Sequence, residues 1–136
     1  MFERKAGDVP NQPEDVPSQQ DSLPCRQEES DALDALIAAP QHHRLLFENK
    51  SVRVLDTCIR PGETTGLHTH RWPGTLYILN WSDFVRRDER GTVMLDSRTL
   101  PAIAPGTALW SAPLASHTLE NVGDADLRVI AVELKS

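Results

Sequence analysis

The chain has 136 residues, of which 39% are hydrophobic, which is enough for one domain with a modest core. Its formal net charge of −6 arises in residues 1–40, which hold nine acidic and three basic residues, whereas residues 41–136 hold eleven of each. Because this neutral body has no basic patch and no apolar run of about 18 residues, we expect neither a nucleic-acid partner nor a membrane association. The lack of a secretory-type apolar stretch and the presence of only Cys25 and Cys58 indicate a cytoplasmic protein with free thiols.

Residues 1–29 contain four prolines and very few large apolar side chains, so we expect a polar, disordered leader. A single domain is expected over residues 30–136. The stretch SDALDALIAAP predicts a short helix over residues 31–39, capped by Ser30 or Asp31 and ended by the proline that follows.

From residue 43 onward, short apolar runs alternate with turn signals such as Pro61-Gly62, Pro73-Gly74 and the segment 88–91. Many short strands at regular spacing predict an all-β fold, a sandwich or a closed barrel, rather than an α/β fold. The expected strands are 43–49, 52–59, 67–70, 75–81, 83–87, 92–96, 99–103, 107–111, 117–121 and 127–134.

Two histidines in the segment LHTHRWP form the first candidate site. Side chains alternate along a strand, so His68 and His70 share one face, with Thr69 on the other. His117 begins a later strand, and three histidines from two strands are a common ligand set for a divalent first-row transition metal. The alternative is that the pair consists of two polar residues on an ordinary strand.

The spacing around these histidines extends the pattern. Five residues separate Gly62 from His68, Gly106 lies eleven residues before His117, and three residues separate His117 from Asn121. These residues resemble the two motifs of the cupin superfamily, G-x5-H-x-H-x3,4-E-x6-G and G-x5-P-x-G-x2-H-x3-N. The H-T-H-R-W-P segment is similar to that of small single-domain bacterial cupins. The resemblance implies a cupin-type antiparallel β-barrel of the jelly-roll class.

The resemblance covers roughly residues 43–135, and it departs from the family pattern at the metal site. Gly74 or Thr75 occupies the place of the motif glutamate, Pro113 comes one place late, and Leu114 replaces the inner glycine. The resemblance therefore implies a site of three neutral imidazoles, from His68, His70 and His117, which leaves more positions open to substrate.

The ion implied by the resemblance is a divalent transition metal, Fe, Ni, Mn, Cu or Zn, with its identity left open. The leading reaction type is a dioxygenase-like oxidation of a small organic molecule, because some oxygen-using cupins work with three histidines. The alternative is a cupin without a bound metal that binds or senses a small molecule and catalyses nothing.

Alternation also gives an expected cavity lining. If Thr75 faces inward, Tyr77 and Leu79 also do. Tyr77 is the candidate catalytic residue, as a hydrogen-bond donor to a bound substrate or water, although a packed core aromatic is the alternative. The candidate substrate-binding residues are Trp72, which follows the ligand strand and could cover the mouth, Thr75, Leu79, and Leu119, which shares a face with His117.

The remaining charged and polar residues yield weaker hypotheses. His42 and His43 point to opposite faces of a strand, so we expect both at the surface. The segment FVRRDERG, residues 84–91, is expected to be solvated at a hairpin tip. Arg53 or Arg60 could orient an acidic substrate if either faces the barrel.

The oligomeric state is expected by analogy with small cupins, which often form dimers. The barrel core of residues 43–135 is small and would gain from further burial. We therefore predict a homodimer, with helix 31–39 and strand 43–48 as the partner surface.

Overall fold

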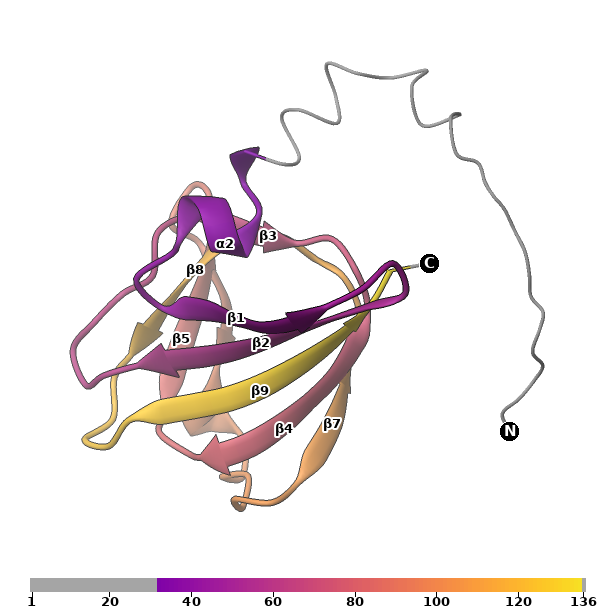
Figure 1. Cartoon of the computed structure of the whole chain (residues 1–136). Helices are drawn as coiled ribbons and strands as arrows, with labels where there is room; N and C mark the ends of the chain where they lie inside the picture. The colour runs from indigo at the N-terminus through magenta and orange to yellow at the C-terminus, as the bar shows by residue number, and fades with distance from the viewer. Residues whose placement is uncertain (1–31, 136) are drawn as a thin grey trace. The chain divides into compact units, whose positions relative to one another are not determined.

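The computed structural model describes residues 32–135, so the predicted leader of residues 1–29 lies outside the described part. Two antiparallel sheets form the fold, one with strand order β1-β2-β9-β4-β7 and one with order β3-β8-β5-β6 (Figure 1). The strands are β1 (His43–Glu48), β2 (Val52–Ile59), β3 (His68–His70), β4 (Gly74–Asn80), β5 (Phe84–Asp88), β6 (Val93–Asp96), β7 (Ala108–Ser111), β8 (Leu114–Asn121) and β9 (Leu127–Leu134).

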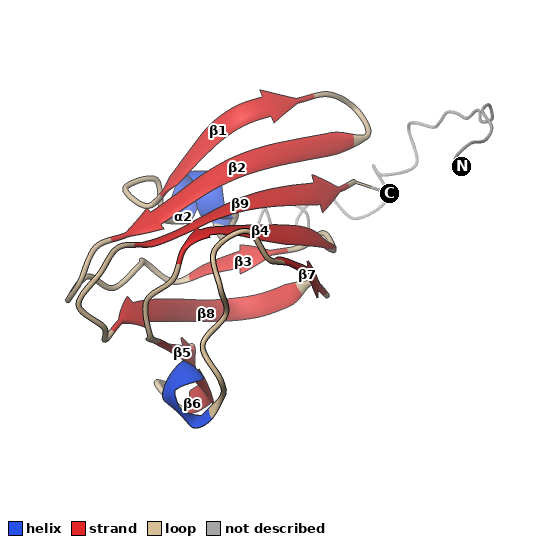
Figure 2. Ribbon diagram, turned by 90° about the horizontal axis from the view of Figure 1, so that it is seen from below, coloured by secondary structure: helices blue, strands red, loops and turns tan. Residues whose placement is uncertain are grey.

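Figure 2 shows the two sheets as facing layers. This confirms the predicted all-β class, and the bounds of β2 and β9 agree with those expected. The strand predicted over residues 99–103 is wrong: the chain forms the 3-10 helix η2 (Ser97–Thr99) and then runs without regular structure. Pro101 lies in this stretch and has no N–H to donate to a ladder.

The predicted helix over residues 31–39 is shorter in the structure, where α2 spans Ala35–Ala38. Asp34 has an extended ψ of 144°, its side chain accepts a hydrogen bond from the Leu36 N–H at 3.1 Å, and it forms an isolated bridge with Thr69. Asp34 therefore caps α2, and the expected caps Ser30 and Asp31 lie outside the described residues. No helix in residues 32–135 combines the length and the hydropathy needed to cross a bilayer.

Three residues that match the two motifs, Gly62, Gly106 and Asn121, have roles in the backbone conformation and packing of the fold. Gly62 and Gly106 have φ values of +83° and +88°, a region that L side chains rarely adopt, so both turns require glycine. Asn121 is fully buried, and its side-chain amide is hydrogen-bonded on both sides. Its partners are Ile59 O, Ser82 Oγ, Gly123 N and Ala125 O. The Gly62 N–H donates to Asn121 O, which joins the turn before β3 to the end of β8, whereas Gly106 lies in the turn before β7.

Candidate metal centre

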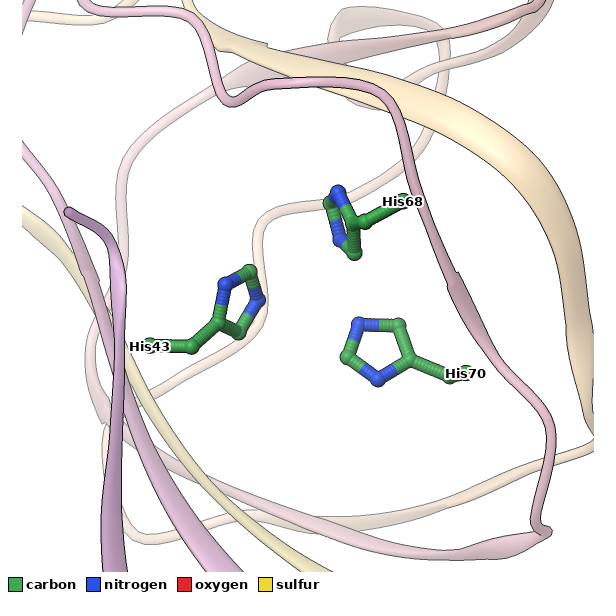
Figure 3. A group of neighbouring side chains, drawn as sticks. All are labelled: His43, His68 and His70. Atoms are coloured by element: carbon green, nitrogen blue, oxygen red, sulfur yellow. The ribbon is translucent and has the colours of Figure 1, made fainter. Parts of the chain in front are cut away.

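Four histidine side chains meet between the two sheets. His43 comes from β1 in one sheet, and His68, His70 and His117 come from β3 and β8 in the other. The ligand nitrogens of His43, His68 and His70 lie within 4.8 Å of one another, and Figure 3 shows these three rings turned toward one another. The His117 ring lies 4.4 Å from that of His68 and 5.6 Å from that of His70, measured between centroids.

This spacing fits a single ion. Metal–nitrogen bonds are about 2.0–2.1 Å long, so two nitrogens on one ion are at most about 4.2 Å apart. The three nitrogens, all within 4.8 Å of one another, lie close to that limit. The described residues therefore contain a buried three-histidine group that could hold a metal ion, with a fourth imidazole against it.

Sequence reasoning brought His68, His70 and His117 together, and their strands do adjoin, since His68 and His117 are cross-strand partners. It missed His43. The alternation argument separates His42 from His43, but the expectation that both are surface residues is wrong: His43 is 5% exposed and is the one buried residue of β1. No pattern in the neighbouring sequence predicts that His43 is buried. Its burial depends on β3, which lies opposite β1, and on α2, which lies beside it.

Each of the four imidazoles is fixed by a hydrogen bond at Nδ1. A carbonyl or carboxylate oxygen can only accept, so each Nδ1 donates, and a neutral ring then presents the lone pair of Nε2. This arrangement is typical of metal-binding histidines, in which an outer partner orients the ring. The four acceptors are Ala39 O for His43 at 2.9 Å, Gly66 O for His68 at 2.7 Å, Glu133 Oε2 for His70 at 3.0 Å and Ala115 O for His117 at 2.7 Å.

Burial also favours the neutral form. Desolvation lowers the pKa of His43 and of His117 to about 3 and that of His68 to about 4, from an ordinary value of 6.5. At neutral pH these three rings are uncharged and can act as ligands without losing a proton.

These shifts predict how stability depends on pH in the chelator-treated protein. Below about pH 6.5 the unfolded histidines take up protons, whereas the folded ones do so only near pH 3–4. The free energy of unfolding should therefore fall as the pH falls through this window, by up to about 1.4 kcal/mol per pH unit for each histidine. Melting temperatures measured from pH 7 to 5 should drop, and more steeply in the wild type than in His117→Gln; a flat wild-type profile would contradict the burial argument.

The structure also supplies a carboxylate that sequence reasoning missed. Gly74, one of the two residues at the place of the motif glutamate, has no side chain, but its cross-strand partner on β9 is Glu133. Glu133 is 4% exposed and accepts a hydrogen bond from His70. A Cβ on Gly74 would lie 2.0 Å from the Val132 carbonyl oxygen, so the close approach of β4 to β9 requires glycine here. The Glu133 carboxylate therefore lies behind the histidine cluster. Its negative charge acts on the cluster through the imidazole of His70, to which it is hydrogen-bonded.

Glu133 belongs to a buried ionic network. Its Oε1 accepts a hydrogen bond from Arg53 Nε at 2.7 Å, and the other two guanidinium nitrogens donate to the two oxygens of Asp34, both at 2.9 Å. Burial disfavours the charged form of Asp34, but the hydrogen bonds and charge of Arg53 outweigh it, so the pKa of Asp34 is lowered. The two carboxylates share the guanidinium of Arg53, and the charge of Arg71 also acts on Asp34.

This network answers the hypothesis about Arg53 and Arg60. Arg53 is 5% exposed, and its guanidinium donates hydrogen bonds to Asp34 and Glu133, so its role is structural. Arg60 is exposed and is absent from the cavity wall. The expectation that either would orient a substrate is therefore not supported by their positions.

A cavity of about 690 Å³ adjoins the histidines, and its walls are mostly apolar. Of the expected substrate-binding residues, Trp72 and Leu119 line it, and Thr75 borders it although its side chain is exposed. Tyr77 and Leu79 do not: they are 45% and 39% exposed, on the outer face of β4. Gly74, Leu76 and Ile78 are the residues of β4 that face the cavity. The prediction assigned the inward face to Thr75, Tyr77 and Leu79, and it was therefore shifted by one residue along the strand.

Comparisons with known proteins identify the fold. No family model matches the sequence, and no curated protein matches it. Among solved structures, a cupin domain from Bordetella pertussis is 17% identical with a TM-score of 0.57, covering 69% of this chain and 92% of that one. An RmlC-like cupin family protein with a double-stranded β-helix fold from Methanocaldococcus jannaschii is 13% identical with a TM-score of 0.49, covering 68% and 77%.

A further structural match is the polyketide cyclase RemF from Streptomyces resistomycificus, 18% identical with a TM-score of 0.49, covering 73% of this chain and 68% of that one. At such identities the similarity concerns the fold, and the Bordetella domain carries the assignment because its TM-score exceeds those of the other two. Two facing antiparallel sheets, a histidine cluster between them and this structural match agree with the resemblance seen in the motifs. The described part of the chain has the fold of a cupin domain.

Proposed function

We propose that the chain is a small metal-dependent cupin that acts on a small organic molecule held in its cavity. The ligands are His43, His68 and His70, with His117 as the fourth. The observation that carries the proposal is the Nδ1 hydrogen bond of every one of these rings, which commits each neutral imidazole to present Nε2. Four such rings in one buried place are difficult to explain as ordinary core residues.

A divalent ion at this place would supply Lewis acidity, and iron would add redox chemistry toward dioxygen, so a dioxygenase-like oxidation is the proposed reaction type. Glu133 holds the orientation of His70 and provides compensating charge. Trp72 and Leu119 form apolar cavity walls that would exclude water from the substrate. Trp72 is itself held among cationic side chains, with the Arg53 guanidinium 5.0 Å and that of Arg71 4.3 Å from its ring.

The proposal is tested by elemental analysis of untagged protein beside the His117→Ala variant. We expect stoichiometric metal in the wild type and a reduced content in the variant. Iron-loaded wild type is then assayed for oxygen uptake with a panel of small thiols, diketones and phenols, in which at least one compound should be consumed.

Two results would redirect the proposal. Absence of metal from both proteins, even after iron, nickel, copper, manganese or zinc is supplied, would reject the metal centre and favour a cupin that binds or senses a small molecule without turnover. Stoichiometric iron without turnover or substrate-dependent spectral change over the whole panel would reject the oxidative reaction and retain the metal site.

We also propose a homodimer formed through α2 and β1. β1 is an edge strand whose Leu45, Leu46 and Phe47 are 43%, 44% and 53% exposed, and Ile37 of α2 is 62% exposed. Light scattering at micromolar concentration should give the dimer mass for the wild type and the monomer mass for Phe47→Glu. Val93→Glu, at an equally exposed apolar position on β6, is the control and should stay dimeric. A monomeric wild type would contradict the proposal.

A further inference from the structure

Two adjacent arginines on β5 point to opposite faces of their sheet. Arg87 Nη1 donates to Glu120 Oε1 at 2.8 Å, forming a half-exposed ion pair outside the cavity. Arg86 lines the cavity. The expectation that residues 84–91 are a solvated hairpin tip is therefore wrong for residues 84–88, because β5 is an interior strand paired with both β6 and β8.

Arg86 has no counter-ion in residues 32–135. No hydrogen bond or ion pair to its guanidinium is found there. Its cross-strand partners are Leu95 on β6 and Leu119 on β8, both apolar. Burial is the one cause that lowers its pKa, with no opposing carboxylate. A half-buried guanidinium without an anion is costly, since buried charges are normally paired.

The cavity around Arg86 contains one carboxylate, and it is already engaged. Among residues 32–135, Glu133 is the sole acidic residue of the lining, and its oxygens accept hydrogen bonds from Arg53 and His70. Most other lining residues are apolar, among them Leu100, Ile103 and Leu109. The cavity therefore combines an apolar wall, one unpaired cation and the histidine cluster.

Arg86 lies close enough to the histidines to act on the same molecule. Arg86 is the cross-strand partner of Leu119, which follows His117 by two positions on the same face of β8, and all three residues line the cavity. Trp81 also belongs to the lining and packs edge-on against Phe84, and its indole N–H is buried with no acceptor in the described residues. Two donor groups of lining residues thus lack an acceptor oxygen within the described residues, although buried donors normally find one.

We propose that Arg86 binds the carboxylate of the substrate, which is a small monocarboxylic acid with an apolar body. The proposal rests on the small-molecule cavity of the proposed function and names its substrate class. A planar guanidinium binds a carboxylate through two parallel hydrogen bonds, and the apolar walls accept the rest of the molecule. A carboxylate carries one negative charge, which matches the single unpaired cation, Arg86. A phosphate dianion would need a second positive charge in the cavity.

The test compares the wild type with Arg86→Gln and, as matched control, Arg87→Gln. Full-length protein, as purified and after chelator treatment, is titrated with benzoate and with its neutral analogue benzamide. Calorimetry and the fluorescence of the cavity tryptophans report binding. Benzoate should bind the wild type and Arg87→Gln equally and should bind Arg86→Gln about 10- to 100-fold more weakly. Benzamide should bind all three proteins alike.

Equal benzoate affinity in the wild type and Arg86→Gln would overturn the proposal, as would no preference of the wild type for benzoate over benzamide. Tighter binding of phenyl phosphate than of benzoate would overturn the carboxylate assignment. Arg86-dependent benzoate binding to protein that takes up no metal would support this inference while rejecting the metal-dependent function, so the two failures are distinguishable.

Discussion

His43→Ala is expected to lower the affinity of the protein for its metal by more than about 100-fold. Loss of an outer partner of a ligating histidine costs 10- to 100-fold, and loss of a ligand should cost more. His43 contributes one of the three nitrogens that lie within 4.8 Å of one another, and it is the one ligand from β1. Metal content by elemental analysis and affinity by competition with a chromophoric chelator give the two readouts.

The chain offers a matched control next to this position. His42 bonds Glu63 at 3.3 Å and is absent from the cavity wall, so His42→Ala should keep the metal content and affinity of the wild type. If His43→Ala retains wild-type metal and His117→Ala loses it, the ion is held by His68, His70 and His117 without His43. Equal losses in His42→Ala and His43→Ala would indicate general unfolding, which circular dichroism of both variants checks.

Arg53→Met is expected to destabilise the fold by about 3–5 kcal/mol. It removes the guanidinium that joins Asp34 to Glu133, and both carboxylates then remain buried without their cation. Because small domains are stable by about 5–15 kcal/mol in total, this loss is a large fraction. Urea unfolding followed by tryptophan fluorescence, with chelator present so that metal loss does not contribute, measures the difference.

Arg44→Ala is the control for this prediction. Arg44 also pairs with a buried carboxylate, Asp56, but its side chain is 68% exposed and Asp56 keeps a second partner in Arg128. Its removal should cost less than about 1 kcal/mol. An Arg53→Met variant that is unfolded without urea agrees with the prediction, whereas one within about 1 kcal/mol of the wild type would show that the network contributes little to stability.

The local patterns predicted what depends on neighbours in the sequence. Alternation placed His68 and His70 on one face, and turn signals placed Gly62 and Gly91 where positive φ values are found. The same patterns failed where their phase was ambiguous. Thr75 and Gly74 were both compatible with the motif spacing, and choosing Thr75 turned Tyr77 and Leu79 inward when their side chains lie outside.

The sequence by itself determined an all-β cupin fold and three of the four clustered histidines, because strand periodicity, turn glycines and motif spacing are short-range properties. Only the tertiary structure placed His43, Glu133 and Arg86, since each depends on which strands pair and which faces meet. Glu133 accepts a hydrogen bond from His70, 63 positions away in the chain, and the register of β4 against β9 sets it opposite Gly74. His43 joins the cluster because β1 faces β3 across the two sheets. Strand pairing over such separations is fixed by the packing of the whole domain, which no local pattern encodes.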